Sequence, residues 1–176
     1  KGNPLWILSS EHLQSRLRQE QEIKRLRDVL GPHFDSIKLV AYIRRPIDLA
    51  VSLLSQQLKN GQRPFTVLEC DHPYIRNLCD HETMIKKWSR AFKPESIVIR
   101  RFQRETLKNK NVIHDFFAAV GIESLDEFTV PKVSNQRLSE SAMKYLWHLN
   151  KRFPAFINNH YNYKRDGLVD CIIECF

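Results

Sequence analysis

Three residues at one turn of the chain have the types and spacing of an anion-binding site. In Lys38–Gly61, "KLVAYIRRPIDLAVSLLSQQLKNG", an apolar run stops at Arg44, Pro46 opens a helical pattern, and Ser52 follows on its polar face. A guanidinium, a hydroxyl and the free amides of a helix N-terminus all donate hydrogen bonds to phosphate-like anions. This spacing indicates an anion site, and a surface arginine followed by a solvated helix serine is the alternative.

The elements around this turn predict an α/β fold. Three apolar runs are typical of buried strands: Leu5–Ser10, Ile37–Ile43 and Ser96–Phe102. Helices are expected at Glu11–Leu30 in two pieces, Ile47–Leu58, His81–Phe92, Asn111–Val120 and after an N-cap at Ser139, with a loop over Gly61–Asp80. Strands that alternate with helices predict a mostly parallel central sheet with helices on both faces. Ligands bind such sheets beyond the carboxyl ends of the strands, where this chain places charged residues.

The segment "IRRPIDLAVS" resembles the 3′-phosphate-binding element of sulfotransferases that use 3′-phosphoadenosine-5′-phosphosulfate (PAPS). In that family a strand ends in Arg-x-Pro and five residues separate the proline from a serine, as between Pro46 and Ser52. "SSEHL", "IVIRRF" and "NQRLS" also resemble, in this order, segments of bacterial sulfotransferase-like proteins linked to polysaccharide modification. The resemblance covers roughly Leu5 to Phe153 and implies a P-loop NTPase-like sulfotransferase fold. It implies sulfuryl transfer from PAPS to a carbohydrate hydroxyl, with cofactor contacts from Arg44, Arg45 and Ser52.

Two features depart from the family pattern. Arg45 stands where the family commonly has Asp or Asn, which adds a positive charge. The Gly-rich turn with Lys, Thr and Ser that holds the 5′-phosphosulfate is absent from this sequence, whose five glycines are scattered. We therefore expect residues 1–176 to form a single, partial sulfotransferase-like domain that is truncated at its N-terminus, as its first residue, Lys1, also suggests.

The resemblance also implies a catalytic base after the first predicted strand. Relatives of this fold place a glutamate or histidine in a comparable position, so Glu11 is the first candidate and His12 the second. An acid that merely favours a helix N-terminus is the alternative for Glu11. Further charge or nucleotide contacts are considered at four positions: Lys59, Arg101, Asn135 and Arg137.

The amino-acid composition limits the kinds of ligand and the setting that we expect for this chain. The chain has 28 Lys+Arg against 20 Asp+Glu, which favours an anionic ligand, and it has no aromatic platform or reading motif typical of a nucleic-acid binder. No apolar run is long enough to span a membrane. Four cysteines without a CxxC pair indicate a reducing, cytoplasmic setting.

A metal site and two alternative functions are weighed beside the carbohydrate sulfotransferase. A zinc site could use the two "CDH" repeats through Cys70, His72, Cys79 and His81, but their spacing is not that of a known zinc module, and no metal is expected. A catalytically inert module on the same fold could bind an anion or glycan. A P-loop-type kinase would need a Gly-rich Lys-Ser/Thr loop that this sequence lacks.

Overall fold

The chain folds into two compact units, each built from two separate stretches of sequence. The computed structural model describes residues 4–10, 12–62, 73–126, 128–129 and 137–175. The first unit joins Lys1–Ile43 to Asp80–Leu125, and the second joins Arg44–Cys79 to Asp126–Phe176. That residues 1–176 form a single partial sulfotransferase-like domain stays a prediction.

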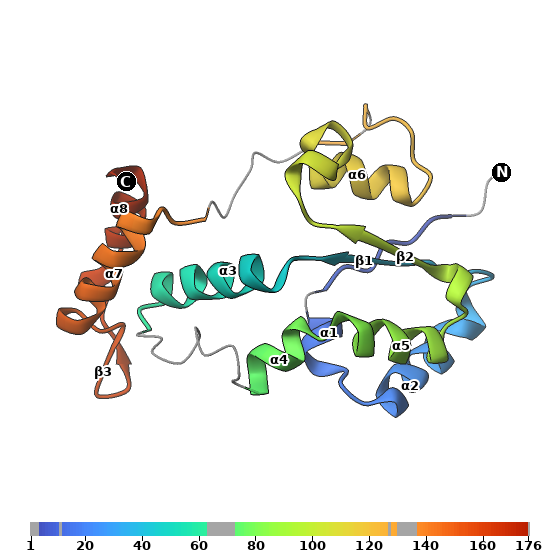
Figure 1. The fold of residues 1–176 in the computed structure, drawn as a ribbon, viewed down its shortest axis with the longest axis horizontal. Coiled ribbons are helices and arrows are strands. Elements are labelled where there is room, and N and C mark those ends of the chain that lie inside the picture. Colours follow the sequence, from blue (N-terminus) through green and yellow to red (C-terminus); the bar gives the residue numbers. More distant parts are fainter. Residues whose placement is uncertain (1–3, 11, 63–72, 127, 130–136, 176) are drawn as a thin grey trace. The chain divides into compact units, whose positions relative to one another are not determined.

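A parallel pair of strands forms the centre of the first unit. β1 (Leu39–Ile43) pairs with β2 (Ile97–Arg101), with Leu39 opposite Ile97. The helices of this unit are α1 (His12–Arg16), α2 (Glu20–Leu30), α5 (His81–Ala91) and α6 (Val112–Ala119). Figure 1 shows α2 and α5 on one side of the strand pair and α6 on the other. The predicted α/β class, with parallel strands and helices on both faces, is confirmed for this two-stranded sheet.

The core of the first unit lies where α2 and α5 meet the strands. Ile23 of α2 is buried against Trp88 and Phe92, whose rings stack with centroids 5.8 Å apart. Leu39 and Ile97, which are opposite each other in the strand pair, pack against this cluster. The apolar residues that recur every three or four positions in these helices therefore form the core, as the periodicity predicts.

The prediction of a strand at Leu5–Ser10 is wrong. Residues 5–10 form no strand in the structure, and the side chains of Leu5, Trp6 and Leu8 are 59%, 69% and 68% exposed. An apolar run forms a strand only when a neighbour accepts its backbone hydrogen bonds and covers a face. Within the described residues the sheet of the first unit has two strands, and this run is not one of them.

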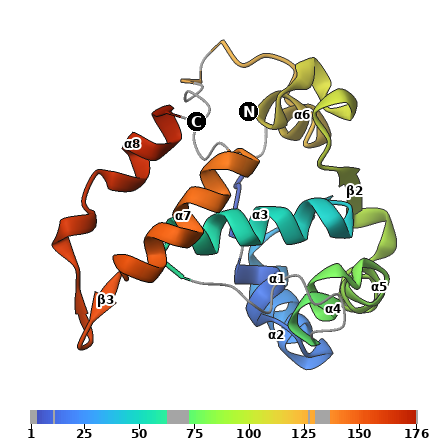
Figure 2. The ribbon, with the colours of Figure 1, turned by 60° about the vertical axis from the view of Figure 1, so that its left-hand side comes forward.

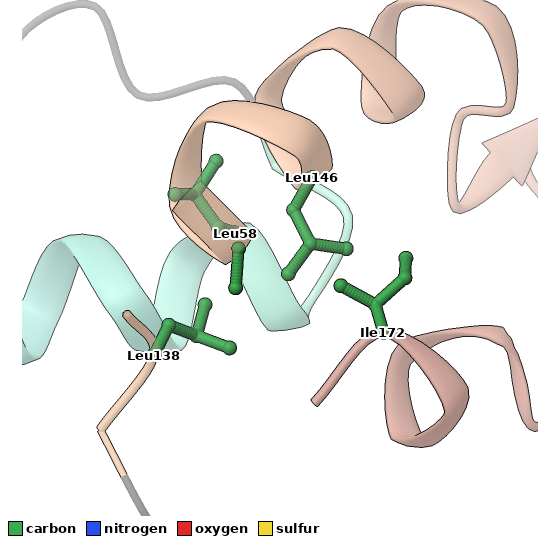
Figure 3. Close-up of a cluster of buried hydrophobic side chains, with 5 residues drawn as sticks. Leu58, Leu138, Leu146 and Ile172 are labelled. Carbon is green, nitrogen blue, oxygen red and sulfur yellow. The ribbon is translucent and has the colours of Figure 1, made fainter. Parts of the chain in front are cut away.

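The described part of the second unit is mainly helical and includes one short hairpin. Its elements are α3 (Pro46–Lys59), α4 (Pro73–Cys79), α7 (Glu140–Arg152), β3 (Phe156–Ile157), β4 (His160–Tyr161) and α8 (Leu168–Cys175). α7 lies against both α3 and α8 (Figure 2). Their shared core contains Leu58, Leu138, Ala142, Leu146 and Ile172, of which Leu146 is fully buried (Figure 3). Ser139 accepts a hydrogen bond from the backbone N–H of Ala142, which confirms it as the N-cap of α7.

Three details of the second unit correct the sequence prediction. The loop expected over Gly61–Asp80 contains α4. The apolar spacing that begins at Ile47 predicts that this residue faces the core and that Ser55 lies on the opposite, polar face of α3. Ile47 is instead 61% exposed, and Ser55 is 4% exposed. Ser55 is buried because its hydroxyl accepts a hydrogen bond from the backbone N–H of Leu138 at 3.2 Å, a partner 83 residues away that local periodicity cannot reveal.

Candidate functional site

Arg44 and Ser52 contact each other at the start of α3. The Arg44 Nη1 atom donates to Ser52 Oγ at 3.0 Å, and both side chains are half-buried. Pro46 occupies the first turn, where its fixed φ suits a helix and its missing N–H removes no helical hydrogen bond. The predicted pair is thus held together on a 14-residue helix whose first amides have no partner within the helix itself. A guanidinium, a hydroxyl and a helix N-terminus are the donors that an oxyanion accepts.

The charges around this pair favour an anion. Burial lowers the pKa of the Arg44 guanidinium, and the nearby carboxylate of Asp48 opposes this only in part. Asp48 is itself engaged by Arg45, whose Nε and Nη2 donate to its two carboxylate oxygens at 2.6 and 3.2 Å. That ion pair lowers the pKa of Asp48, and the charges of Arg137 and Arg44 lower it further.

Arg137 joins the same group of charges. The neighbouring Leu138 donates its backbone N–H to Ser55, one turn beyond Ser52 on α3, so the segment is held against this helix. The second unit therefore places the charges of Arg44, Arg45 and Arg137 around the first turns of α3, with Asp48 as the acid among them. We refer to these four residues and Ser52 as the arginine cluster. The predicted nucleotide contact by Arg137 stays a prediction, and Asn135 lies outside the described residues.

The two candidate bases lie elsewhere in the chain. His12 begins the short helix α1, is exposed, and donates its backbone N–H to Ser10 Oγ at 3.1 Å. Glu11 lies outside the described residues. His12 belongs to the first unit and the arginine cluster to the second, and the role of His12 as a base stays a prediction.

Of the two other cations considered from the sequence, Lys59 lies far from the cluster, and a contribution by Arg101 stays a prediction. Lys59 is the last residue of α3, about 20 Å along the helix from its first turn at 1.5 Å per residue. Arg101 is an exposed residue at the end of β2, in the first unit.

A buried carboxylate near the ends of the strands escaped the sequence analysis. Asp115 is fully buried and accepts hydrogen bonds from Tyr42 Oη at 2.8 Å, Arg100 Nη2 at 2.7 Å and the backbone N–H of Lys108 at 2.9 Å; Arg100 Nε also donates to it. The Arg100 guanidinium is the main cause that lowers the pKa of Asp115 to about 2, although burial opposes the shift. Burial, followed by the Asp115 carboxylate, raises the pKa of Tyr42. The sequence signal for this buried carboxylate is the single acid, Asp115, among the apolar residues of α6.

The zinc alternative was considered at the two "CDH" repeats and stays untested. No group of three or more His, Cys, Asp or Glu side chains comes together in the part of the chain that the structure describes. Cys70 and His72 of the two "CDH" repeats lie outside the described residues. Cys171 and Cys175, one turn apart in α8, carry free thiols, and their proximity raises the pKa of the Cys171 thiol. No helix among the described residues has the length and apolarity needed to cross a membrane.

Comparisons of the sequence with protein-family models and curated proteins, and of the structure with solved structures, returned no match.

Proposed function

We propose that this chain carries the 3′-phosphate-binding half of a PAPS-dependent sulfotransferase that acts on a carbohydrate hydroxyl. The observation that carries the proposal is the contact between Arg44 Nη1 and Ser52 Oγ on a helix whose first turn contains Pro46. The proposed fold is the P-loop NTPase-like sulfotransferase fold, and the parallel pair β1–β2 with its flanking helices supports the coarser α/β class of that proposal. PAPS is the proposed co-substrate, and no metal takes part in the proposed reaction.

The arginine cluster supports the 3′-phosphate assignment by its charge and geometry. A 3′-phosphate would accept from Arg44, from Ser52 and from the first amides of α3. Burial lowers the pKa of Arg44 because it disfavours the charged guanidinium, and the negative charge of the phosphate would offset that cost. Arg45 and Arg137 would add a second layer of positive charge. Each of these donors belongs to the second unit.

The proposed transfer is an in-line displacement at sulfur. The acceptor hydroxyl oxygen forms a bond to sulfur while the bond between sulfur and the bridging phosphate oxygen breaks, and 3′-phosphoadenosine-5′-phosphate leaves. The hydroxyl proton passes to a base, for which Glu11 and then His12 are the proposed candidates. As in phosphoryl transfer, positioning and charge stabilisation supply most of the catalysis.

Calorimetric titration with 3′-phosphoadenosine-5′-phosphate, AMP and ATP tests the nucleotide half of the proposal. We expect a preference for the nucleotide with the 3′-phosphate. Arg44→Ala should remove this preference and weaken binding about 10- to 100-fold, because a charge-assisted hydrogen bond is lost. Ser52→Ala should weaken it about five-fold. The matched control is Arg25→Ala, which removes an exposed arginine from α2 in the first unit.

The outcome separates the proposal from its alternative. If neither the chain nor its variants discriminate the 3′-phosphate, the sulfotransferase function is refuted. A basic module that binds an anion or glycan without transfer would then be the better description, since this sequence has no Gly-rich Lys-Ser/Thr turn to hold a 5′-phosphosulfate. If the preference is present, transfer from PAPS to oligosaccharides is the next assay, with Glu11→Gln and His12→Ala as the variants.

A further inference from the structure

A β-hairpin in the second unit presents aromatic rings to solvent. Phe156 of β3 and Tyr161 of β4 are opposite each other, with ring centroids 6.0 Å apart, and Tyr163 follows two residues later with its ring 5.5 Å from Tyr161. Both pairs meet edge to face. The three residues are 63%, 43% and 78% exposed. We refer to these three residues as the aromatic platform, which the sequence did not lead us to expect. Contiguous exposed apolar surface of this kind marks interaction sites in proteins.

Hydrogen bonds from residues in and beside the hairpin hold the platform in place. Asn162 donates its side-chain N–H to the carbonyl of Pro154 at 3.0 Å and its backbone N–H to that of Ala155 at 2.8 Å. The buried Arg165 donates to the carbonyl of Phe153, and Tyr161 Oη donates to Asp166 at 3.0 Å. The hairpin is therefore ordered before any ligand arrives, which lowers the entropic cost of binding.

The hairpin also packs onto the far end of α3. A Cβ atom on Gly61 would lie 2.4 Å from Ala155 Cβ, so the two backbones approach as closely as only glycine permits. The side chain of Asn150 donates to the carbonyls of Leu58 and Gln62, at 3.0 and 2.9 Å. The arginine cluster begins at the other end of α3, about 20 Å away. The platform is thus a separate surface of the second unit.

We propose that the aromatic platform binds an acidic polysaccharide. The C–H faces of a sugar ring carry a small positive charge and stack on the negative faces of aromatic rings. The stretch from Lys151 to Asp166 contains four Lys or Arg residues and a single acid, Asp166, which accepts a hydrogen bond from Tyr161 Oη. The exposed cations of this stretch, Arg152 and Lys164, leave a net positive charge that is complementary to carboxylate groups. Asn158, Asn159 and His160 add exposed hydrogen-bonding groups at the turn, which suit sugar hydroxyls.

The residues around the platform argue against a nucleic acid and against an anionic membrane as its partner. Nucleic-acid binding needs several Lys or Arg contacts to phosphates, but two of the four cations near the hairpin already contact other groups of the protein. Arg165 is buried against Phe153, and Lys151 lies over the ring of Trp147, 4.7 Å from its centroid. A membrane-inserting hairpin would place apolar residues at its tip, where this one has Asn158 and Asn159, both with the positive φ of a tight hairpin turn.

Binding of the full chain to hyaluronan oligosaccharides, which carry one carboxylate on every second sugar, tests the proposal by calorimetry. Dextran, an oligothymidylate and phosphatidylserine vesicles are titrated in parallel. We expect tighter binding to hyaluronan than to dextran. Tyr163→Ala and Phe156→Ala should each weaken it about five-fold, since each removes one stacking ring. Tyr163→Trp should retain binding, and Lys164→Gln should weaken it and reduce its salt dependence.

Matched controls come from α7 of the same unit. Tyr145→Ala and Lys144→Gln remove an exposed tyrosine and an exposed lysine away from the hairpin and should leave binding unchanged. Arg44→Ala should also bind hyaluronan normally, so failure of the nucleotide site and failure of this proposal are distinguished. The proposal is overturned if the unmodified chain does not bind hyaluronan or if Tyr163→Ala and Phe156→Ala bind it as tightly. Hairpin-dependent binding of the oligothymidylate or the vesicles in its place would also overturn it.

Discussion

Replacing Asp48 with Asn should make the chain bind 3′-phosphoadenosine-5′-phosphate more tightly. Asp48 is the carboxylate within the arginine cluster, held by Arg45 at 2.6 and 3.2 Å. An incoming phosphate is repelled by Asp48 and competes with it for the same guanidinium groups. Asn preserves the size of the side chain while it removes the charge, so the substitution tests electrostatics rather than packing.

The magnitude follows from the position of Asp48 on α3. Asp48 and Ser52 are one helical turn apart, so a phosphate bound by Ser52 would lie about 6 Å from the carboxylate. Two unit charges at that distance repel by about 0.7 kcal/mol in water and about 2.8 kcal/mol near a protein surface. Salt reduces the effect by about half at that distance. We therefore expect a gain of about 1 kcal/mol, or a roughly five-fold lower Kd.

Calorimetric titration at low and at physiological salt measures this change. The gain should be larger at low salt, because screening weakens the repulsion that the substitution removes. Asp28→Asn is the matched control, since Asp28 also pairs with an arginine, Arg27, on an exposed helical surface, but in the first unit. The reasoning is refuted if Asp48→Asn binds the nucleotide no more tightly than the unmodified chain. It is also refuted if Asp28→Asn gives the same gain, because net charge alone would then explain it.

Three further substitutions test the stability of the two units by thermal and urea unfolding. Gly61→Ala should lower the free energy of unfolding by about 2 kcal/mol more than Gly167→Ala, because both have positive φ but only Gly61 would clash with Ala155; equal losses would contradict the clash. Leu146→Ala should lower it by about 3 kcal/mol, since the side chain is fully buried, and a loss below about 1 kcal/mol would contradict that packing. Asp115→Asn should lower it by about 2 kcal/mol at neutral pH. The pKa of Asp115 is lowered to about 2, so its contribution is present above about pH 4 and disappears as the pH falls toward 2; a difference between Asp115→Asn and the unmodified chain that stays constant over this range would contradict it.

Much of the secondary structure could be predicted because its signals are local. The apolar spacing in α2 and α5, the proline at the start of α3 and the N-cap at Ser139 each specify an element through neighbours a few residues away. The parallel pairing of β1 and β2 followed from the helices expected between the strands. The contact between Arg44 and Ser52 was likewise within reach, since both residues flank the first turns of one helix.

Predictions failed where a partner distant in sequence decides the environment. Leu5–Ser10 has the composition of a strand, but composition does not supply the neighbouring strand that it needs. Ser55 has the polarity of a surface residue, yet the backbone of Leu138 buries it. Asp115 was overlooked because its partners Tyr42 and Arg100 come from two strands, and only their pairing brings both side chains to one carboxylate.

The sequence by itself determined the helices, the parallel strand pair and the turn that joins Arg44 to Ser52, because these depend on propensities and contacts within a few residues. Only the tertiary structure decided which polar groups are buried and which aromatic rings are exposed. The backbone of Leu138 satisfies the buried hydroxyl of Ser55, and Asp115 accepts hydrogen bonds from three residues. The hairpin exposes Phe156, and the turn that follows it exposes Tyr163. Burial is a property of the surroundings of a residue, and the chain assembles those surroundings from segments that are far apart in sequence.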